Sequence, residues 1–334
     1  MKNITIQDIA NEASVSKATV SRVLNNTSPV RPDKREAILE AIQRLGFKPN
    51  VVARSLAKGR SMTIGVLTQN IGSPFYDTIS QGVIAGLGET GYSPIFADGQ
   101  WQRGAEVEAI QALIGRRVDG LVLIGGDIPA EQLEELCRDL PTVVVARQLP
   151  SDHHHCIFTN NVDGGYCATR HLIENGHREI AIVRGIEHHP DAIDRYEGYK
   201  RALAEAGIEL DPRLVLPGDF SAESGVSAID DLSERGRTFT AVFAANDTTA
   251  FGVRLALYRR GLRVPEDVSI VGFDDQAEAA FMAPPLTTVR QPGREMGALA
   301  SGSLLELIDG KPFESRPLLA ELIERESVGR GPGA

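Results

Sequence analysis

Several polar residues follow apolar runs of the kind that form buried strands. Arg195, Asn246 and Asp274 each come after such a run in the second half of the chain. A guanidinium group can donate to two adjacent hydroxyls, a carboxylate can accept from two, and an amide can do both. These residue types therefore suit the recognition of a polyol.

Two aspartates next to these candidate contacts have alternative, structural roles. Asp247 stands where a helix is expected to begin, so we expect it to be largely the N-cap of that helix and Asn246 to be the contact residue. Asp275, which follows Asp274, is either structural or a contact.

A similar arrangement occurs in the first half of the body. Ser73, Phe75 and Arg147 come after the first and fourth expected strands. Arg147 suits an anionic ligand and a neutral one equally.

No motif for catalysis or for a cofactor is found. Gly125-Gly126 and Gly164-Gly165 lack the spacing of a dinucleotide fingerprint, and neither a P-loop nor a Gly-x-Ser-x-Gly elbow occurs. We therefore predict no catalytic residue, no cofactor and no enzymatic activity.

One histidine tract resembles a metal site. His153, His154 and His155 precede Cys156, but consecutive residues of an extended segment point in alternating directions. We interpret the tract as a solvated loop and predict no metal. The three cysteines of the chain, in a sequence without an apolar leader or a long apolar segment, are typical of reduced thiols in a cytoplasmic protein that does not enter a membrane.

The elements that would position these residues alternate between strand and helix from Thr63 onward. Two series of apolar runs occur, and amphipathic stretches separate them. This pattern predicts parallel sheets covered on both faces by helices, in two lobes, with ligands at the carboxyl ends of the strands. The expected strands begin at residues 63, 93, 120, 142, 156, 179, 214, 241 and 268, and the expected helices span 81–90, 105–116, 165–175, 196–206, 225–235 and 248–260.

The first part of the chain predicts a different, all-helical unit. Thr5 is an N-cap, and Ile6, Ile9 and Ala10 recur at helical spacing. After a break at Ser14-Val15, Ser16 caps a second helix from Lys17 to Asn25, and a third helix spans residues 32–45. Two short helices joined by a tight turn are typical of a helix-turn-helix.

The charge distribution indicates what this unit binds. Residues 1–60 carry eleven Lys and Arg against five Asp and Glu, about +6, whereas the whole chain carries −10. A basic end on an acidic protein points to nucleic acid. The predicted contacts in this unit are Thr5, Ser16, Lys17, Ala18, Thr19, Ser21, Arg22 and Asn25.

The first part of the chain resembles a known family. Ile6-Gln-Asp-Ile-Ala10, Val15-Ser-Lys-Ala-Thr-Val-Ser-Arg-Val-Leu-Asn25 and Gly46-Phe-Lys-Pro-Asn-Val-Val-Ala-Arg-Ser-Leu56 resemble the headpiece and hinge of the lactose repressor/galactose repressor family of transcriptional regulators. One departure is Ser14, where the turn of the family often has glycine.

The resemblance implies a hinge that binds DNA. In the family this helix lies in the minor groove, so Asn50, Ala53 and Leu56 are expected contacts, with Leu56 as an apolar wedge that kinks the duplex. Alone the segment is shorter than a helix that is stable in water. A flexible linker is the alternative interpretation.

The resemblance also implies the organisation of the body. It is expected to be like a periplasmic sugar-binding protein, with the chain crossing between lobes near residues 160, 291 and 320. The expected parts are a headpiece at 1–49, a hinge at 50–60 and an effector-binding and dimerisation domain at 61–334. Within that domain, lobe 1 comprises 61–160 and 292–320, and lobe 2 comprises 161–291 and 321–334.

For the ligand, the resemblance implies that Arg195, Asn246 and Asp274 contact an effector and that Phe220 stacks on it. Asn161 stands where many members have aspartate, and we include it among the contacts. A neutral mono- or disaccharide is favoured over a phosphosugar, because no cluster of Lys and Arg at a helix N-terminus is evident. A nucleobase corepressor is a weaker alternative.

The predicted function is a repressor that binds a palindromic operator as a homodimer and is released by a sugar. The tetramer of the lactose repressor needs a C-terminal heptad helix, and the residues after Glu326 cannot form one. Corepression, rather than induction, stays open. A solute-binding protein without DNA binding is disfavoured by the basic helix-turn-helix.

Overall fold

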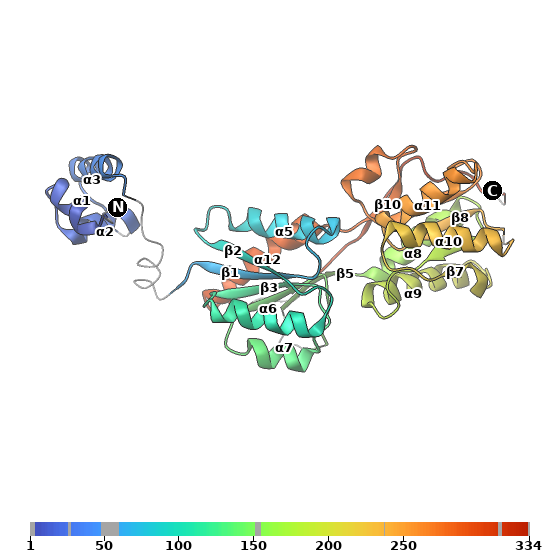
Figure 1. The fold of residues 1–334 in the computed structure, drawn as a ribbon, viewed down its shortest axis with the longest axis horizontal. Helices are drawn as coiled ribbons and strands as arrows, with labels where there is room; N and C mark the ends of the chain where they lie inside the picture. The colour runs from blue at the N-terminus through green and yellow to red at the C-terminus, as the bar shows by residue number, and fades with distance from the viewer. Residues whose placement is uncertain are drawn as a thin grey trace. The chain divides into compact units, whose positions relative to one another are not determined.

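The computed structural model describes residues 4–25, 28–47, 60–150, 155–236, 238–312 and 316–332. The chain divides into two units, Met1–Ser61 and Met62–Ala334, which we call the head and the body (Figure 1). The predicted hinge residues Asn50, Ala53 and Leu56 lie outside the described residues.

The head consists of the helices α1 (Ile6–Glu12), α2 (Lys17–Asn25) and α3 (Pro32–Leu45). Thr5 caps α1 in a capping box, because its hydroxyl accepts from the Asp8 N–H and the Asp8 carboxylate accepts from the Thr5 N–H. Ile9, Val20 and Ile38 are fully buried between the helices. The predicted helix-turn-helix is therefore formed.

The apolar residues of α1 differ in burial. Ile9 and Ala10 are buried, whereas Ile6, the first residue of the helix, is 37% exposed.

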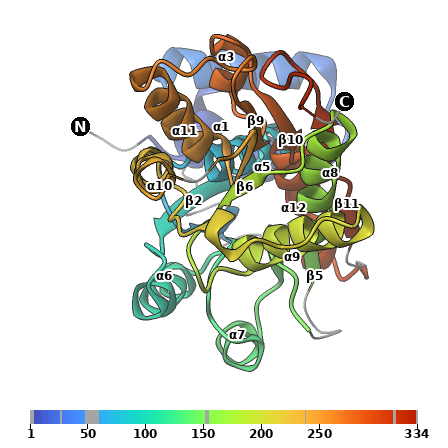
Figure 2. The same ribbon diagram turned by 90° about the vertical axis from the view of Figure 1, so that its right-hand side faces the viewer.

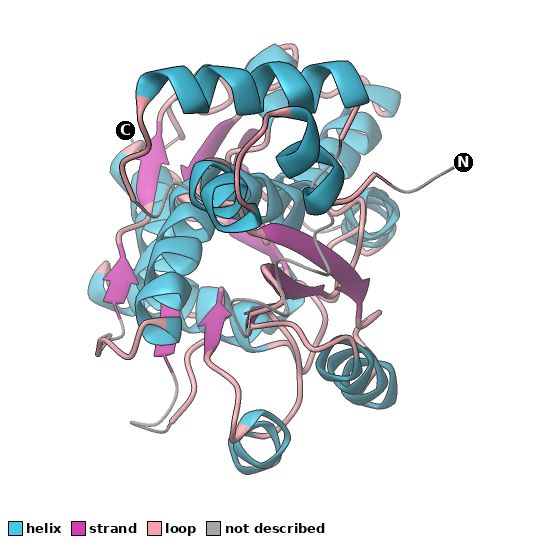
Figure 3. Cartoon of the chain, turned by 90° about the vertical axis from the view of Figure 1, so that its left-hand side faces the viewer, coloured by secondary structure: helices cyan, strands magenta, loops and turns pink. Residues whose placement is uncertain are grey.

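Lobe 1 of the body is a six-stranded parallel sheet with the order β11-β5-β4-β3-β1-β2. Helices cover both of its faces (Figures 1 and 3). The strands are β1 (Thr63–Thr68), β2 (Ser93–Asp98), β3 (Gly120–Ile124), β4 (Thr142–Val145), β5 (His155–Thr159) and β11 (Arg316–Leu318), and the helices are α5 (Pro74–Leu87), α6 (Arg103–Gly115), α7 (Ala130–Cys137) and α12 (Gly293–Ile308).

Alternation along the strands of lobe 1 supplies two cores. Ile64 and Val66 of β1 pack with α5 and α12 on one face, whereas Leu67 packs with α6 and α7 on the other. Cys156, next to the histidine tract, is 1% exposed in the second of these cores. His153 and His154 lie outside the described residues.

Lobe 2 has a second six-stranded sheet, with the order β12-β10-β9-β8-β6-β7. Only the β10–β12 pair among these strands is antiparallel. Helices α8 and α9 lie on one face and α10 and α11 on the other (Figures 1 and 2). The strands are β6 (Ile180–Val183), β7 (Val215–Leu216), β8 (Ala241–Ala244), β9 (Ser269–Asp274), β10 (Thr287–Arg290) and β12 (Glu321–Ile323). The helices are α8 (Asn161–Glu174), α9 (Pro190–Glu205), α10 (Ala222–Glu234) and α11 (Asp247–Arg259), with 3-10 turns at Pro212–Leu214 and Ala277–Phe281.

The chain crosses between the sheets at three places. The crossings follow β5, β10 and β11, after which the chain enters α8, α12 and β12 respectively. The predicted α/β fold, with parallel sheets covered on both faces, is confirmed. None of the helices in the described part of the chain combines the length and apolar character needed to cross a membrane.

Several helices begin earlier than the sequence pattern predicts. Helix α9 starts at Pro190 rather than near Tyr196, because His189 caps it and proline suits the first helical position. Helix α5 starts at Pro74, where proline again suits the first helical position, although the Ser73 side chain makes no capping hydrogen bond. Arg195 therefore lies on the second turn of α9 and does not directly follow a strand.

Candidate functional site

The outer face of α2 is the candidate nucleic-acid interface of the head. The Ser16 hydroxyl accepts from the Thr19 N–H over 3.2 Å, so Ser16 caps α2 as predicted. Lys17, Ala18 and Arg22 are exposed on this helix, and Thr19 and Ser21 are half-buried. The side chain of Asn25 is not among those described. Charged and small side chains thus share one accessible surface.

The turn before α2 has a left-handed residue. Ser14 has φ +52°, a conformation that glycine adopts without a steric penalty. A glycine at this position would therefore adopt the turn without strain, whereas the serine of this chain is strained there.

A cavity of about 380 Å³ opens at the carboxyl ends of the strands of both lobes. Such a volume lies within the roughly 300–1,000 Å³ typical of small-molecule sites. Six of the eight predicted contact residues line it: Ser73, Phe75, Arg195, Phe220, Asn246 and Asp274. Arg147 and Asn161 do not.

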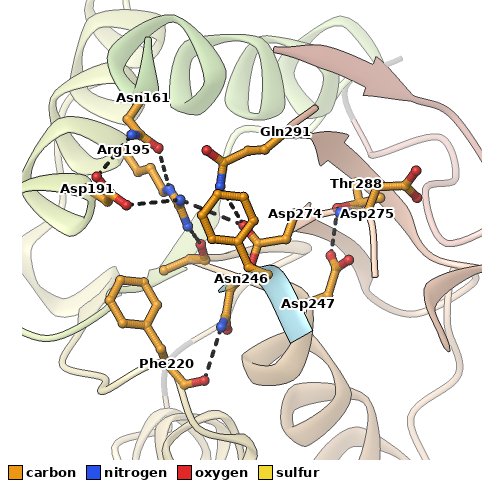
Figure 4. A network of polar contacts seen from close by, with 12 residues as sticks. Asn161, Asp191, Arg195, Phe220, Asn246, Asp247, Asp274, Asp275, Thr288 and Gln291 are labelled. Atoms are coloured by element: carbon orange, nitrogen blue, oxygen red, sulfur yellow. Dashed lines mark hydrogen bonds and ion pairs between the residues drawn. The ribbon is translucent and has the colours of Figure 1, made fainter. Parts of the chain in front are cut away.

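Arg195 is the centre of a polar network (Figure 4). Its side chain reaches from α9 across the ends of the lobe 2 strands and is 3% exposed. Nη1 donates to the Ala245 carbonyl over 2.6 Å, and Nη2 lies 3.7 Å from Oδ1 of Asp274 and 3.8 Å from Oδ2 of Asp191. The guanidinium also stacks on Phe273, with its carbon 3.8 Å from the ring centroid. Arg195 is therefore held rigidly at the cavity wall.

Asp274 provides the opposing acceptor. It ends β9 with φ +102°, and its Oδ1 accepts from Nε2 of Gln291 over 2.8 Å. Burial raises the pKa of Asp274 to about 6, although Arg195 and the Gln291 hydrogen bond act in the opposite direction. Gln291 lies in the segment that crosses to lobe 1, so this carboxylate is connected to the joint between the lobes.

The roles of Asn246 and Asp247 differ from the prediction. Asn246 is the N-cap of α11, because its side-chain oxygen accepts from the Thr249 N–H over 2.9 Å. Its amide nitrogen donates to the Phe220 carbonyl, and the residue also lines the cavity. Asp247 is fully buried in the first turn and accepts from the Gln276 N–H and the Thr288 hydroxyl. The expectation that Asp247 is the cap is wrong, since its carboxylate points to β10 and the loop after β9 (Figure 4).

Asp275 has a structural environment. Its carboxylate oxygens accept from Arg290 over 2.7 Å and from Arg325 over 2.6 Å. It thereby ties β9 and β10 to the segment that follows β12, and it does not line the cavity.

Asn161 and Arg147 do not line the cavity. Asn161 is 8% exposed and bridges two wall residues, since it accepts from Nε of Arg195 and donates to Asp191. Arg147 is half-buried after β4, where burial lowers its pKa and the carboxylates of Glu106 and Asp127 raise it.

Aromatic side chains form the rest of the wall. Phe220, with φ +68°, brings its ring to the lobe 2 side, and Phe75 and Tyr76 line the lobe 1 side. Sequence reasoning missed Trp101 and His189, whose ring centroids are 4.5 Å apart. The available signal was that Trp101, in the turn after β2, is the single tryptophan of the chain.

Comparison with known proteins gives consistent similarities. The family description "Bacterial regulatory proteins, lacI family" matches residues 5–50, and "Periplasmic binding protein-like domain" matches residues 169–328. Catabolite control protein A of Priestia megaterium is 35% identical over 94% of this chain and 95% of its own length. The HTH-type transcriptional repressor PurR of Vibrio atlanticus is 37% identical over 97% of this chain and 98% of its own length.

Solved structures agree with these relatives. The Lac repressor dimer bound to operator and the anti-inducer ONPF superposes with a TM-score of 0.88 at 30% identity, covering 98% of this chain and 100% of that one. The complex of transcriptional regulator CelR with cellobiose gives a TM-score of 0.72 at 35% identity, covering 97% and 99%.

Proposed function

Because the chain belongs to the lacI family of bacterial regulatory proteins and is a DNA-binding transcriptional repressor with an effector-binding domain, we propose its finer mode of action. It binds a palindromic operator as a homodimer in the cytoplasm, and a small neutral sugar in the cavity of the body releases it. Relatives of this family are repressors rather than enzymes, which agrees with a protein that acts by binding alone.

The observation that carries the sugar proposal is the set of polar groups around Arg195. Arg195 and Asp274 place a donor fork and an acceptor on one wall, Asn246 adds an amide, and Phe220 adds a ring. Adjacent hydroxyls of a sugar can bridge the donor and the acceptor, while the apolar face of its ring packs on the phenyl group.

The charge of the cavity wall favours a neutral ligand. Among the described residues that line it, Arg195 is the one Lys or Arg, against the carboxylates of Asp191, Asp219 and Asp274. His189 also lines the cavity, and burial lowers its pKa, so its ring is neutral at physiological pH. A phosphosugar would bring negative charge to a wall that already carries an excess of it.

A nucleobase corepressor is the second candidate. It is favoured by four rings that line the cavity and can stack on a purine, those of Phe75, Tyr76, Trp101 and Phe220. The 37% sequence identity with the PurR of Vibrio atlanticus also favours it. In that case the ligand would strengthen operator binding rather than weaken it.

Exposed apolar side chains support a dimer. Ile84 of α5 is 50% exposed and Leu299 of α12 is 36% exposed, and these helices pack against each other in lobe 1. Tyr258 and Phe281 of lobe 2 are 70% and 87% exposed. A second copy could cover such side chains, and two heads on one two-fold axis would match two half-sites.

Release by the sugar requires a difference in affinity between two states. A ligand shifts an equilibrium only by as much as it prefers one state, and couplings of about 1–3 kcal/mol are typical. Since the cavity is lined by both lobes, a change in the angle between them would change how well the ligand is held.

The DNA arm of the proposal is tested with an operator selected from a random duplex library. Arg22→Ala should lower the affinity for the selected operator and reduce its advantage over unrelated DNA, because Arg22 is exposed on α2. Lys34→Ala, on exposed α3, is the matched control and should keep that advantage. If Arg22→Ala and the wild type prefer the selected operator over unrelated DNA equally, α2 is excluded as the recognition helix.

The effector arm uses a panel of ribose, glucose, cellobiose, lactose, maltose, glucose 6-phosphate and hypoxanthine. Thermal stability and operator affinity are measured for each compound, since a ligand of the native state raises the melting temperature. A neutral sugar should raise stability and lower operator affinity. If hypoxanthine or the phosphosugar alone acts, or if none of the neutral sugars does, the sugar proposal is wrong.

A further inference from the structure

Trp101 connects the two lobes across the cavity. It lies in lobe 1, in the turn between β2 and α6, and its ring is 4.5 Å from that of His189 in an edge-on arrangement. His189 belongs to lobe 2, where it caps α9. Both rings line the cavity. The contact is therefore made between lobes, at the site where a ligand would enter.

The rings continue on both sides of this contact. The His189 ring is 5.4 Å from the Phe220 ring in lobe 2, and the Trp101 ring is 5.7 Å from the Tyr76 ring in lobe 1. A row of aromatic rings thus runs from the polar wall of lobe 2 to the wall of lobe 1. Such a row is longer than the single ring that one pyranose needs.

The turn that carries Trp101 is strained. Gln100 and Trp101 have φ +55° and +54°, a left-handed conformation that is uncommon for residues other than glycine and asparagine. Asp98 holds the turn, because its carboxylate accepts from the Gln100 N–H over 2.9 Å and from the Ile71 N–H over 3.1 Å. Strain of this kind persists where the surroundings enforce it, and it concentrates at binding sites.

We propose that Trp101 is a specificity-determining contact for a ligand of two rings, a disaccharide or a glycoside with a ring-shaped aglycone. This inference rests on the proposed sugar function. One ring of the ligand is held by Arg195, Asp274, Asn246 and Phe220, and the second packs on Trp101. Because Trp101 and Phe220 belong to different lobes, a two-ring ligand that packs on both rings contacts both lobes at once.

The binding test compares cellobiose with glucose on the full chain by calorimetry. The wild type should bind cellobiose at least about tenfold more tightly than glucose. Trp101→Leu should remove most of that preference by weakening cellobiose alone, and Trp101→Phe should restore most of it, because a phenyl ring can still stack. Gln111→Leu, at an exposed residue of α6, is the control and should bind as the wild type does.

Two binding results would overturn the inference while leaving a sugar effector in place. One is that glucose or ribose binds as tightly as the best of cellobiose, lactose and maltose. The other is that Trp101→Leu weakens one-ring and two-ring sugars equally, or neither of them. If no neutral sugar binds the wild type, the proposed function fails, and the two-ring inference fails with it.

A measurement without ligand tests the interlobe contact itself. The single tryptophan is an intrinsic fluorophore, so its emission reports on the surroundings of Trp101 alone. His189→Ala should change the emission and make Trp101 about twofold or more accessible to acrylamide, because the ring seated against it is lost. His188→Ala, at the exposed neighbouring residue, should change neither. Emission and quenching unaffected by His189→Ala would show that the contact is absent in solution and would overturn the inference whatever the sugars do.

Discussion

The side-chain oxygen of Asn161 accepts a hydrogen bond from Nε of Arg195 over 2.9 Å, and both residues are almost completely buried. The other end of the same amide donates to Asp191 over 3.1 Å. Asn161 thus fixes the rotation of the guanidinium without reaching the cavity. Its contribution to binding would be made through the geometry of Arg195.

Asn161→Ala should therefore weaken binding of the effector sugar by about tenfold, since a hydrogen bond to a charged group contributes roughly 1.5–3 kcal/mol. Operator affinity without sugar should stay as in the wild type. Calorimetry and operator titrations check the two parts. Asn161→Asp keeps an acceptor for Nε and should bind more tightly than Asn161→Ala. The reverse order would contradict a positioning role.

The carboxylate of Asp274 predicts a pH dependence of stability without ligand. Burial raises its pKa to about 6 from 3.8, so the folded protein holds this proton more tightly than the unfolded chain does. The stabilising effect is complete below about pH 4 and is lost as the pH rises through about 6, an effect on the order of 3 kcal/mol. Asp274→Asn should therefore raise the free energy of unfolding near neutral pH, relative to the wild type, and lose that advantage near pH ~4.

Denaturant unfolding at both pH values checks this, and Asp267 provides a control of opposite sign. Hydrogen bonds from Arg263 lower the pKa of Asp267 to about 2, so its stabilising effect is present at neutral pH and is lost as the pH falls through that value. Asp267→Asn should then be less stable than the wild type at neutral pH, and the difference should shrink in acid. An Asp274→Asn difference that is the same at every pH would contradict the assignment to this carboxylate.

Gly165 predicts a steric limit behind the site. A Cβ at this residue of α8 would overlap the carbonyl oxygen of Arg195 on α9. Gly165→Ala should push the two helices apart, lower stability by about 1–3 kcal/mol and displace Arg195 from the cavity wall. Thermal unfolding and sugar binding should both be affected. Gly104→Ala, at a helical glycine with open space around it, should leave sugar binding unchanged and slightly raise stability.

In the head, Ser14→Gly should relieve the left-handed turn before α2. The left-handed conformation costs roughly 1 kcal/mol for a residue with a Cβ, so glycine should slow amide hydrogen exchange in α1 and α2 by up to about fivefold. Exchange of the full chain, followed over residues 4–25, checks this. Exchange in the body should not change, and faster exchange in the head would contradict the strain at Ser14.

The sequence pattern predicted β1 to β9 because each is a short apolar run, and it missed β10, β11 and β12, which are three or four residues long and lie next to the crossings. Arg195, Asn246 and Asp274 could be placed at the cavity because they, or the elements that carry them, follow strands, whereas Phe220 was placed there by the family resemblance alone. Trp101 was not predicted as a cavity residue. It lies at the cavity because Asp98 holds the strained turn that carries it, and the sequence pattern does not reveal turn geometry of that kind. The sequence also did not show that Asn246, rather than Asp247, caps α11. Either residue type can cap a helix, and Asp247 is instead bound by Thr288, which is distant in sequence.

The three crossings have a consequence for the order in which the body can be completed. Lobe 1 needs α12 and β11, which come after every helix of lobe 2, and Met296, Ala300 and Leu304 of α12 fill its core. A ribosome that has made β1–β5 has therefore produced a lobe in which α5 alone covers the face that α5 and α12 share in the complete body. Within the body, the usual rule that the N-terminal part folds first during synthesis cannot hold for lobe 1. The first lobe to leave the ribosome must wait for the last part of the chain, and until then the uncovered part of that face is available to chaperones.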